Sequence, residues 1–68
     1  MMTEYYRDPY GCTASIKSDI NRDGYVLRVC DPYGRLIYKK KYDTRRGAKI
    51  ALGKLGDGLM EQTRKEVF

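Results

Sequence analysis

The strongest constraint on the fold is a four-residue segment, Asp-Pro-Tyr-Gly, that occurs twice, at 8–11 and 31–34. Each copy places Asp at the first position of a turn, Pro at the second, where it fixes φ, and Gly at the fourth. Because glycine tolerates positive φ, this pattern is typical of a three-residue β-hairpin loop. The flanking residues differ, so we interpret the repeat as one turn used twice. A third breaker, Asn-Arg-Asp-Gly at 21–24, lies between the two copies.

The segments between these breakers favour strands. Residues 25–30 and 36–42 are rich in β-branched and aromatic types, and the second turn joins them. Residues 12–18 alternate between apolar and polar types, which indicates a weaker strand. The pattern predicts a three-stranded antiparallel meander over 12–42. It is preceded by an N-terminal segment and turn, 1–11, whose tyrosines at 5 and 6 add at most a short edge segment.

After the meander the hydrophobic period changes from two to 3.6, because five apolar residues fall on one helical face: Ala48, Ala51, Leu52, Leu55 and Leu59. The pattern predicts a helix over 43–56, capped by Asp43 or Thr44 and stopped by Gly56 and Gly58. Residues 57–68 either extend the helix or form a loose tail. We therefore expect one small α+β domain, 1–68, in which a three-stranded antiparallel β-meander packs against one C-terminal α-helix.

Composition excludes several function classes. A chain of 68 residues has room for one small core, and it contains no His, which removes the usual nucleophile–base pairs and the commonest metal ligand. Cys12 and Cys30 form no CxxC motif, so we expect two reduced thiols rather than a zinc site or a disulfide. The N-terminus lacks a signal-peptide core, and no apolar run is long enough to span a membrane. We expect a cytoplasmic, non-enzymatic protein with no catalytic residues, cofactor, metal or membrane contact.

The charge is concentrated in one stretch. The chain has a formal net charge of +5, and residues 35–54 contain eight basic residues against a single acid, Asp43. A localised field of this kind attracts phosphates. The lysine run at 39–41 is also typical of a solvated edge strand that discourages strand addition. Arg45 and Arg46 open the helix, where the macrodipole disfavours cations, so an anion bound near them would resolve the conflict.

The hairpin register decides which of these cations share a face. If Asp31 and Arg35 flank the loop, Val29 faces Ile37 and Arg28 faces Tyr38. In this register both sheet faces mix apolar and cationic side chains. Whichever face the helix leaves open presents Tyr rings between Arg and Lys side chains, a mixture suited to phosphates and base edges.

The stretch from 21 to about 55 contains a DG-type turn, a strand ending in D-x-x-G, a second strand and a T-x-x-x-A helix opening. The segments that carry this pattern are NRDGY at 21–25, RVCDPYG at 28–34 and DTRRGA at 43–48. The pattern resembles the N-terminal arm-binding (AP2-like) DNA-binding domain of tyrosine-recombinase integrases of phages and transposons. The resemblance implies a three-stranded sheet, backed by a helix, that lies in the DNA major groove. The contacts it implies are made by Arg22, Arg28, Tyr38 and Lys40. Because no catalytic domain follows the helix, we expect no recombination by the chain itself.

Our leading hypothesis is a small nucleic-acid-binding protein, with duplex DNA favoured over RNA, that uses a basic sheet face and the helix start. The alternative is a protein-binding factor, encoded by a phage or mobile element, that docks on an acidic protein surface. We expect a monomer, with a homodimer through an exposed sheet edge as the other outcome. The candidate binding residues are Arg22, Arg28, Arg35, Tyr38, Lys39, Lys40, Lys41, Arg45, Arg46 and Lys49.

Overall fold

Both Asp-Pro-Tyr-Gly segments form the predicted hairpin loops in the computed structural model, which describes residues 2–18 and 24–67. In the first loop, Asp8 Oδ1 accepts hydrogen bonds from the backbone N–H groups of Tyr10 and Cys12, both at 2.9 Å. In the second, Asp31 Oδ1 accepts the equivalent bonds from Tyr33 at 2.9 Å and Arg35 at 2.8 Å. The glycines take positive φ values of 95° at 11 and 85° at 34. The same four residues therefore give the same loop twice.

The two loops, called here the twin turns, lie against each other at one end of the sheet. A Cβ built on Gly11 would stand 3.3 Å from the Cβ of Pro32. This proximity follows from the topology, because each turn joins antiparallel neighbours within the same sheet. The pairing of β2 with β3 therefore brings the twin turns into contact.

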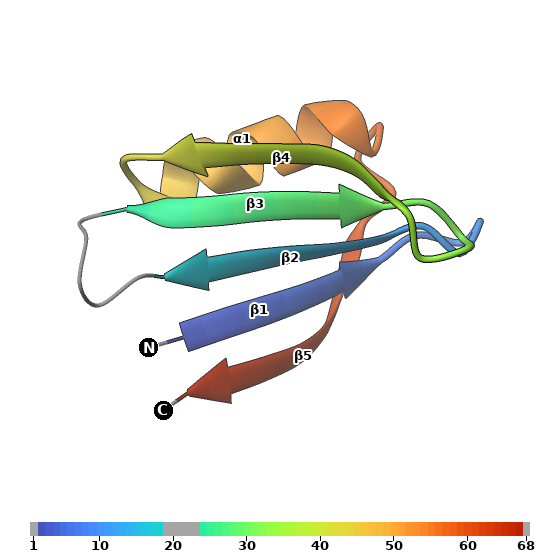
Figure 1. Cartoon of the computed structure of the whole chain (residues 1–68), viewed down its shortest axis with the longest axis horizontal. Coiled ribbons are helices and arrows are strands. Elements are labelled where there is room, and N and C mark those ends of the chain that lie inside the picture. Colours follow the sequence, from blue (N-terminus) through green and yellow to red (C-terminus); the bar gives the residue numbers. More distant parts are fainter. Residues whose placement is uncertain (1, 19–23, 68) are drawn as a thin grey trace.

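Residues 2–18 and 24–67 form five strands and one helix, and the helix covers one face of the sheet (Figure 1). All pairings are antiparallel, and the strand order is β4-β3-β2-β1-β5. The α+β class and the antiparallel sheet under one helix are as predicted, but the sheet has five strands rather than three. The elements are β1 (Met2–Arg7), β2 (Thr13–Ser18), β3 (Tyr25–Cys30), β4 (Leu36–Tyr42), α1 (Arg45–Leu55) and β5 (Glu61–Val67).

The tail is the largest departure from the sequence-based expectation. Residues 61–67 are neither helical nor loose, but form β5 and pair with β1, so β1 is an interior strand rather than a short edge segment. Asp57 and Gly58 turn the chain back with φ values of 51° and 73°. The residues of β5 are mostly good helix formers. Their strand conformation therefore comes from the hydrogen-bonding edge that β1 offers, which outweighs local propensity.

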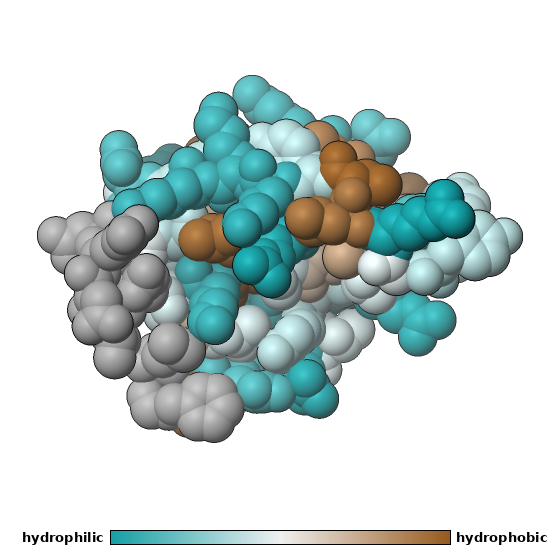
Figure 2. Space-filling model, in the orientation of Figure 1, coloured by the Kyte–Doolittle hydropathy of each residue, from teal (hydrophilic) through white to brown (hydrophobic). Residues whose placement is uncertain are grey.

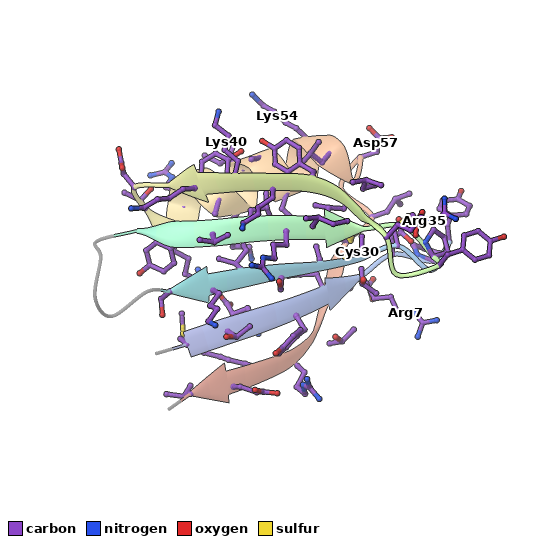
Figure 3. All side chains as sticks on the ribbon, in the orientation of Figure 1. Arg7, Cys30, Arg35, Lys40, Lys54 and Asp57 are labelled. Carbon is purple, nitrogen blue, oxygen red and sulfur yellow. The ribbon has the colours of Figure 1, made fainter. Side chains whose placement is uncertain are left out.

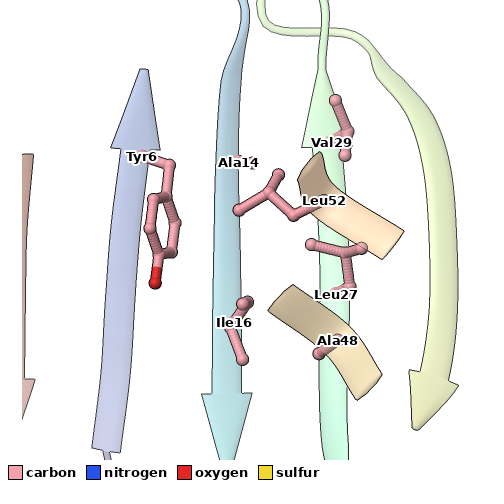
Figure 4. Close-up of a cluster of buried hydrophobic side chains, with 7 residues drawn as sticks. All are labelled: Tyr6, Ala14, Ile16, Leu27, Val29, Ala48 and Leu52. Carbon is pink, nitrogen blue, oxygen red and sulfur yellow. The ribbon is translucent and has the colours of Figure 1, made fainter. Parts of the chain in front are cut away.

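The helix begins and ends at predicted signals. Thr44 is the N-cap, and its hydroxyl oxygen accepts a hydrogen bond from the N–H of Gly47 at 3.0 Å, while Gly56 is the C-cap. Its buried residues, Ala48 and Leu52, press on the sheet and form the core shown in Figure 4. The sheet contributes Tyr6, Ala14, Ile16, Leu27 and Val29 to that core. Leu55 and Leu59 of the predicted stripe are instead exposed.

The register of the β3–β4 hairpin differs from the expected one by a single residue. Cys30 pairs with Leu36 as expected, but Val29 pairs with Tyr38 rather than Ile37. Ile37 is the extra residue of a β-bulge, and one inserted residue moves every following side chain to the opposite face. The expectation that Arg28 faces Tyr38 is therefore wrong.

Candidate functional site

The face of the sheet away from α1, called here the open face, carries several basic side chains in the part of the chain that the structure describes. Burial shows that Leu27 and Val29 point toward the helix, so their neighbour Arg28 points the other way. Directly paired residues share a face, which extends this assignment from strand to strand. The helix lies behind the sheet in Figure 1, so Figure 2 views the open face, where hydrophilic side chains surround smaller hydrophobic patches.

The registers line up one residue from each strand in a row across the middle of the open face. This middle row consists of Lys39, Arg28, Ser15, Tyr5 and Arg64, in the order β4 to β5. One flanking row is Lys41, Val26, Lys17, Thr3 and Glu66, and the other is Leu36, Cys30, Thr13, Arg7 and Glu61. The middle row contains three cations and no acid.

The three rows together place six cations on the open face: Arg7, Lys17, Arg28, Lys39, Lys41 and Arg64. The two carboxylates among them, Glu61 and Glu66, both lie on β5. Within the part of the chain that the structure describes, Arg64 is the one open-face cation in an ion pair, at 2.9 Å from Glu66. The positive field is therefore strongest over β2, β3 and β4.

A shallow basin of about 630 Å³ lies on the open face near the twin turns. Its floor is low because the small side chains of Thr13, Ser15 and Cys30 are neighbours in register. Longer side chains stand around this floor, namely Tyr5, Arg7, Arg28 and Arg64. In Figure 3, Arg7, Cys30 and Arg35 lie toward the end of the sheet that carries the twin turns. The basin is thus an arginine-rimmed hollow rather than an enclosed pocket.

The side chain of Arg64 is held in position from two directions. Its guanidinium carbon lies 4.4 Å from the centroid of the Tyr5 ring, and its Nη2 contacts the Glu66 carboxylate. Thr63, the bulge residue beside it, donates a hydrogen bond from its hydroxyl to the carbonyl oxygen of Tyr5 at 3.3 Å. A planar guanidinium is therefore fixed over an aromatic ring at the edge of the basin.

The structure brings together some of the predicted site residues and separates others. Arg28, Lys39 and Lys41 share the open face, as the hypothesis requires of a basic sheet face. Tyr38 and Lys40 lie on the helix side instead, because of the bulge at Ile37. The Tyr38 and Tyr42 hydroxyls are hydrogen-bonded at 2.7 Å, which raises the pKa of Tyr42, and Lys40 Nζ lies 5.5 Å from the centroid of the Tyr42 ring.

At the helix start, Arg45 is engaged within the chain. Its Nε and Nη2 donate hydrogen bonds to Glu4 Oε1 and Oε2 at 2.5 and 2.6 Å. These bonds hold the pKa of Glu4 below its usual range, against an opposing effect of burial, and raise that of Arg45. Burial raises the pKa of Tyr6, whose hydroxyl donates a hydrogen bond to Glu4 at 3.3 Å. The sequence suggested that an anion binds near the helix start. In the structure, the carboxylate of Glu4 within the same chain occupies that position.

Three further predicted residues, Arg35, Arg46 and Lys49, lie away from the basin floor. Arg46 is exposed on α1, Lys49 Nζ lies 5.6 Å from the centroid of the Tyr6 ring, and Arg35 follows the second twin turn. Arg22 lies outside the described residues. Figure 3 shows Lys40 and Lys54 at the edge of the molecule formed by β4 and α1.

Sequence reasoning missed three of the open-face cations: Arg7, Lys17 and Arg64. Lys17 follows the buried Ile16 in the strand, so the alternating pattern predicts that it lies on the polar face of β2. Arg7 and Arg64 required knowledge that β1 and β5 are full strands in register.

The cysteines and acidic residues of the described ranges are scattered over the fold. Cys12 and Cys30 are both free thiols, and desolvation together with the Asp8 carboxylate raises the pKa of Cys12. No group of three or more potential metal-ligating side chains occurs within residues 2–18 and 24–67. The one helix described there, α1, is too short to cross a membrane.

Comparison with protein-family models, with curated proteins and with solved structures finds no match to this chain. The resemblance to the arm-binding domain of integrases therefore stays a prediction.

Proposed function

We propose that the chain is a small non-enzymatic protein that binds nucleic acid through the open face, with duplex DNA as the ligand. The observation that carries the proposal is the gathering of six cations on one sheet face while both carboxylates of that face lie at the β5 edge. Arginine and lysine side chains in such a field bind backbone phosphates and displace counterions.

The width of the sheet restricts how a duplex is engaged. Five strands span roughly 19 Å, because neighbouring strands lie about 4.8 Å apart, whereas the major groove is about 12 Å wide and admits a two-stranded ribbon. We therefore assign the groove contact to the β3–β4 edge of the open face. We assign the bidentate hydrogen bonds to guanine to Arg28 and the phosphate contacts to Lys39 and Lys41, because these three residues share that edge of the open face.

Exposed apolar residues beside this edge favour an acidic protein surface as the second candidate ligand. Leu36 is 53% and Ile37 is 61% exposed, and Leu36 lies in the row next to Arg28 and Lys39. Apolar contacts of this kind add to a protein interface. A pull-down with and without nuclease separates the two ligands, since partners retained after nuclease indicate protein binding.

The direct test is fluorescence anisotropy of a labelled duplex at two salt concentrations. We expect affinity to fall steeply with salt, and the double variant Lys39→Ala/Lys41→Ala to reduce the slope of log K against log salt by about 1.8. The matched control is Arg46→Ala/Lys54→Ala, which removes the same charge from α1. Undetectable or salt-independent binding, or an equal loss in the control, contradicts the proposal.

A further inference from the structure

The part of the basin over β1 and β5 lies beyond the groove contact proposed above. Arg28 on β3 and Arg64 on β5 occupy the same row, three strand spacings or roughly 14 Å apart. If the β3–β4 edge occupies the major groove, the part of the open face over β1, β2 and β5 lies outside it. The side chains in that part of the open face therefore remain available to a second ligand.

The side chains of the basin match an unpaired nucleic-acid strand. Unpaired bases are held by stacking on aromatic rings and arginine planes, while their edges hydrogen-bond to small polar groups and their phosphates meet cations. The Tyr5–Arg64 stack supplies the planar platform, and Thr13 and Ser15 supply hydroxyl groups on the floor. Arg7 stands on the rim as a phosphate contact, and Arg28 on the β3 side of the rim joins the basin to the groove contact.

The platform is also preorganised. The Tyr5 ring and the Glu66 carboxylate contact Arg64 from two sides, which reduces the side-chain entropy that is lost when a base stacks on it. A hollow of about 630 Å³ falls within the size range of sites for small organic ligands, and nucleotide bases are of that class.

We propose that the basin binds an unpaired strand, so that the preferred ligand is a duplex that continues into a single-stranded tail. The duplex then contacts Arg28, Lys39 and Lys41, and the tail crosses the strands along the middle row toward Arg64. This inference rests on the proposed function, since it assigns a second part of the same open face.

The test compares three DNA probes by anisotropy: a blunt duplex, the same duplex with an unpaired thymidine tail, and the thymidine strand alone. The parent protein is expected to bind the tailed duplex at least about fivefold more tightly than the blunt one, which corresponds to the stacking of one base. Tyr5→Thr removes the platform, and Ser15→Ile fills the floor without changing charge. Both are expected to abolish the preference for the tail and to leave blunt-duplex affinity within about twofold.

The matched control is Tyr33→Thr, the same change at a tyrosine of the twin turns that is 90% exposed. Circular dichroism checks that each variant is folded. If Tyr5→Thr is unfolded, Ser15→Ile alone tests whether the basin gives the preference for the tail. Equal affinity of the parent protein for tailed and blunt duplexes overturns the inference but leaves the proposed function standing. If the two basin variants lose affinity for the tailed and the blunt duplex equally, the inference is also overturned and the proposed function stands, because the basin then binds the duplex backbone. Failure to bind any of the three probes overturns the proposed function as well.

Discussion

The carboxylate of Glu4 on β1 is paired with the guanidinium of Arg45, the first residue of α1, through two hydrogen bonds of 2.5 and 2.6 Å. Glu4 is 1% exposed, whereas the side chain of Arg45 remains 41% exposed. The pair ties the start of the helix to an interior strand of the sheet. It also places a negative charge at the positive end of the helix macrodipole.

Removing the cation from this pair is expected to destabilise the fold more than removing both partners. Arg45→Met leaves a buried carboxylate without its main hydrogen-bond donor, and we expect a loss of roughly 2–4 kcal/mol in the free energy of unfolding. The double variant Glu4→Leu/Arg45→Met should recover part of that loss, because the uncompensated charge is gone. Urea unfolding of the parent and of both variants measures the difference. A double variant less stable than Arg45→Met would show that the pair is not the source of the effect.

The same pair predicts how stability depends on pH. The pKa of Glu4 is lower in the folded chain, chiefly because of the hydrogen bonds from Arg45, so folding favours the ionised form. The resulting stabilisation is fully present above the unfolded-state pKa of Glu, about 4.3, and is lost as the pH falls through the lower folded value. Glu4→Gln removes this titration. The gap in urea midpoint between the parent and Glu4→Gln should therefore be widest near neutral pH and narrow below about pH 4. A gap that stays constant down to the acid range contradicts the assignment.

The twin turns offer a matched pair of substitutions. Gly11 and Gly34 have similar positive φ values, so an alanine at either position is strained by about 1 kcal/mol. A Cβ at Gly11 would also press on Pro32 at 3.3 Å, whereas nothing lies within 4 Å of one at Gly34. Gly11→Ala should therefore lower the unfolding midpoint in urea more than Gly34→Ala. Equal effects would mean that the contact between the turns relaxes freely.

The parts of the fold that were predictable are those encoded locally. The Asp-Pro-Tyr-Gly loops and the Thr44 cap depend on side chains that bond to backbone groups a few residues away, so the sequence alone identifies them. The strand β5 was not predictable in this way, because its residues favour a helix and become a strand only where β1 presents a free edge. Because β5 was not predicted from the sequence, nothing indicated that Arg64 lies beside Tyr5.

The hairpin register failed for a different reason. A bulge leaves no local signature, and the unbulged register mixed cationic and apolar residues on both faces. Inserting Ile37 as an extra residue places Tyr38 and Tyr42 on the side of Leu27 and Val29. The gathering of these two tyrosines with the core residues is the signal from which the bulge could have been inferred, although Lys40 moves to the same side.

This register predicts opposite behaviour for two adjacent lysines. Lys39 pairs with Arg28 on the open face, while Lys40 pairs with Leu27 on the helix side and lies over the ring of Tyr42. Under the proposed function, Lys39→Ala should weaken duplex binding several-fold and reduce the salt slope by about 0.9, because one phosphate contact is lost. Lys40→Ala removes the same charge from the same strand and should leave both quantities near the parent values. Anisotropy titrations at two salt concentrations measure the two effects, and thermal unfolding shows whether either variant alters the fold. If Lys40→Ala weakens binding as much as Lys39→Ala, the open face is not the surface that contacts DNA.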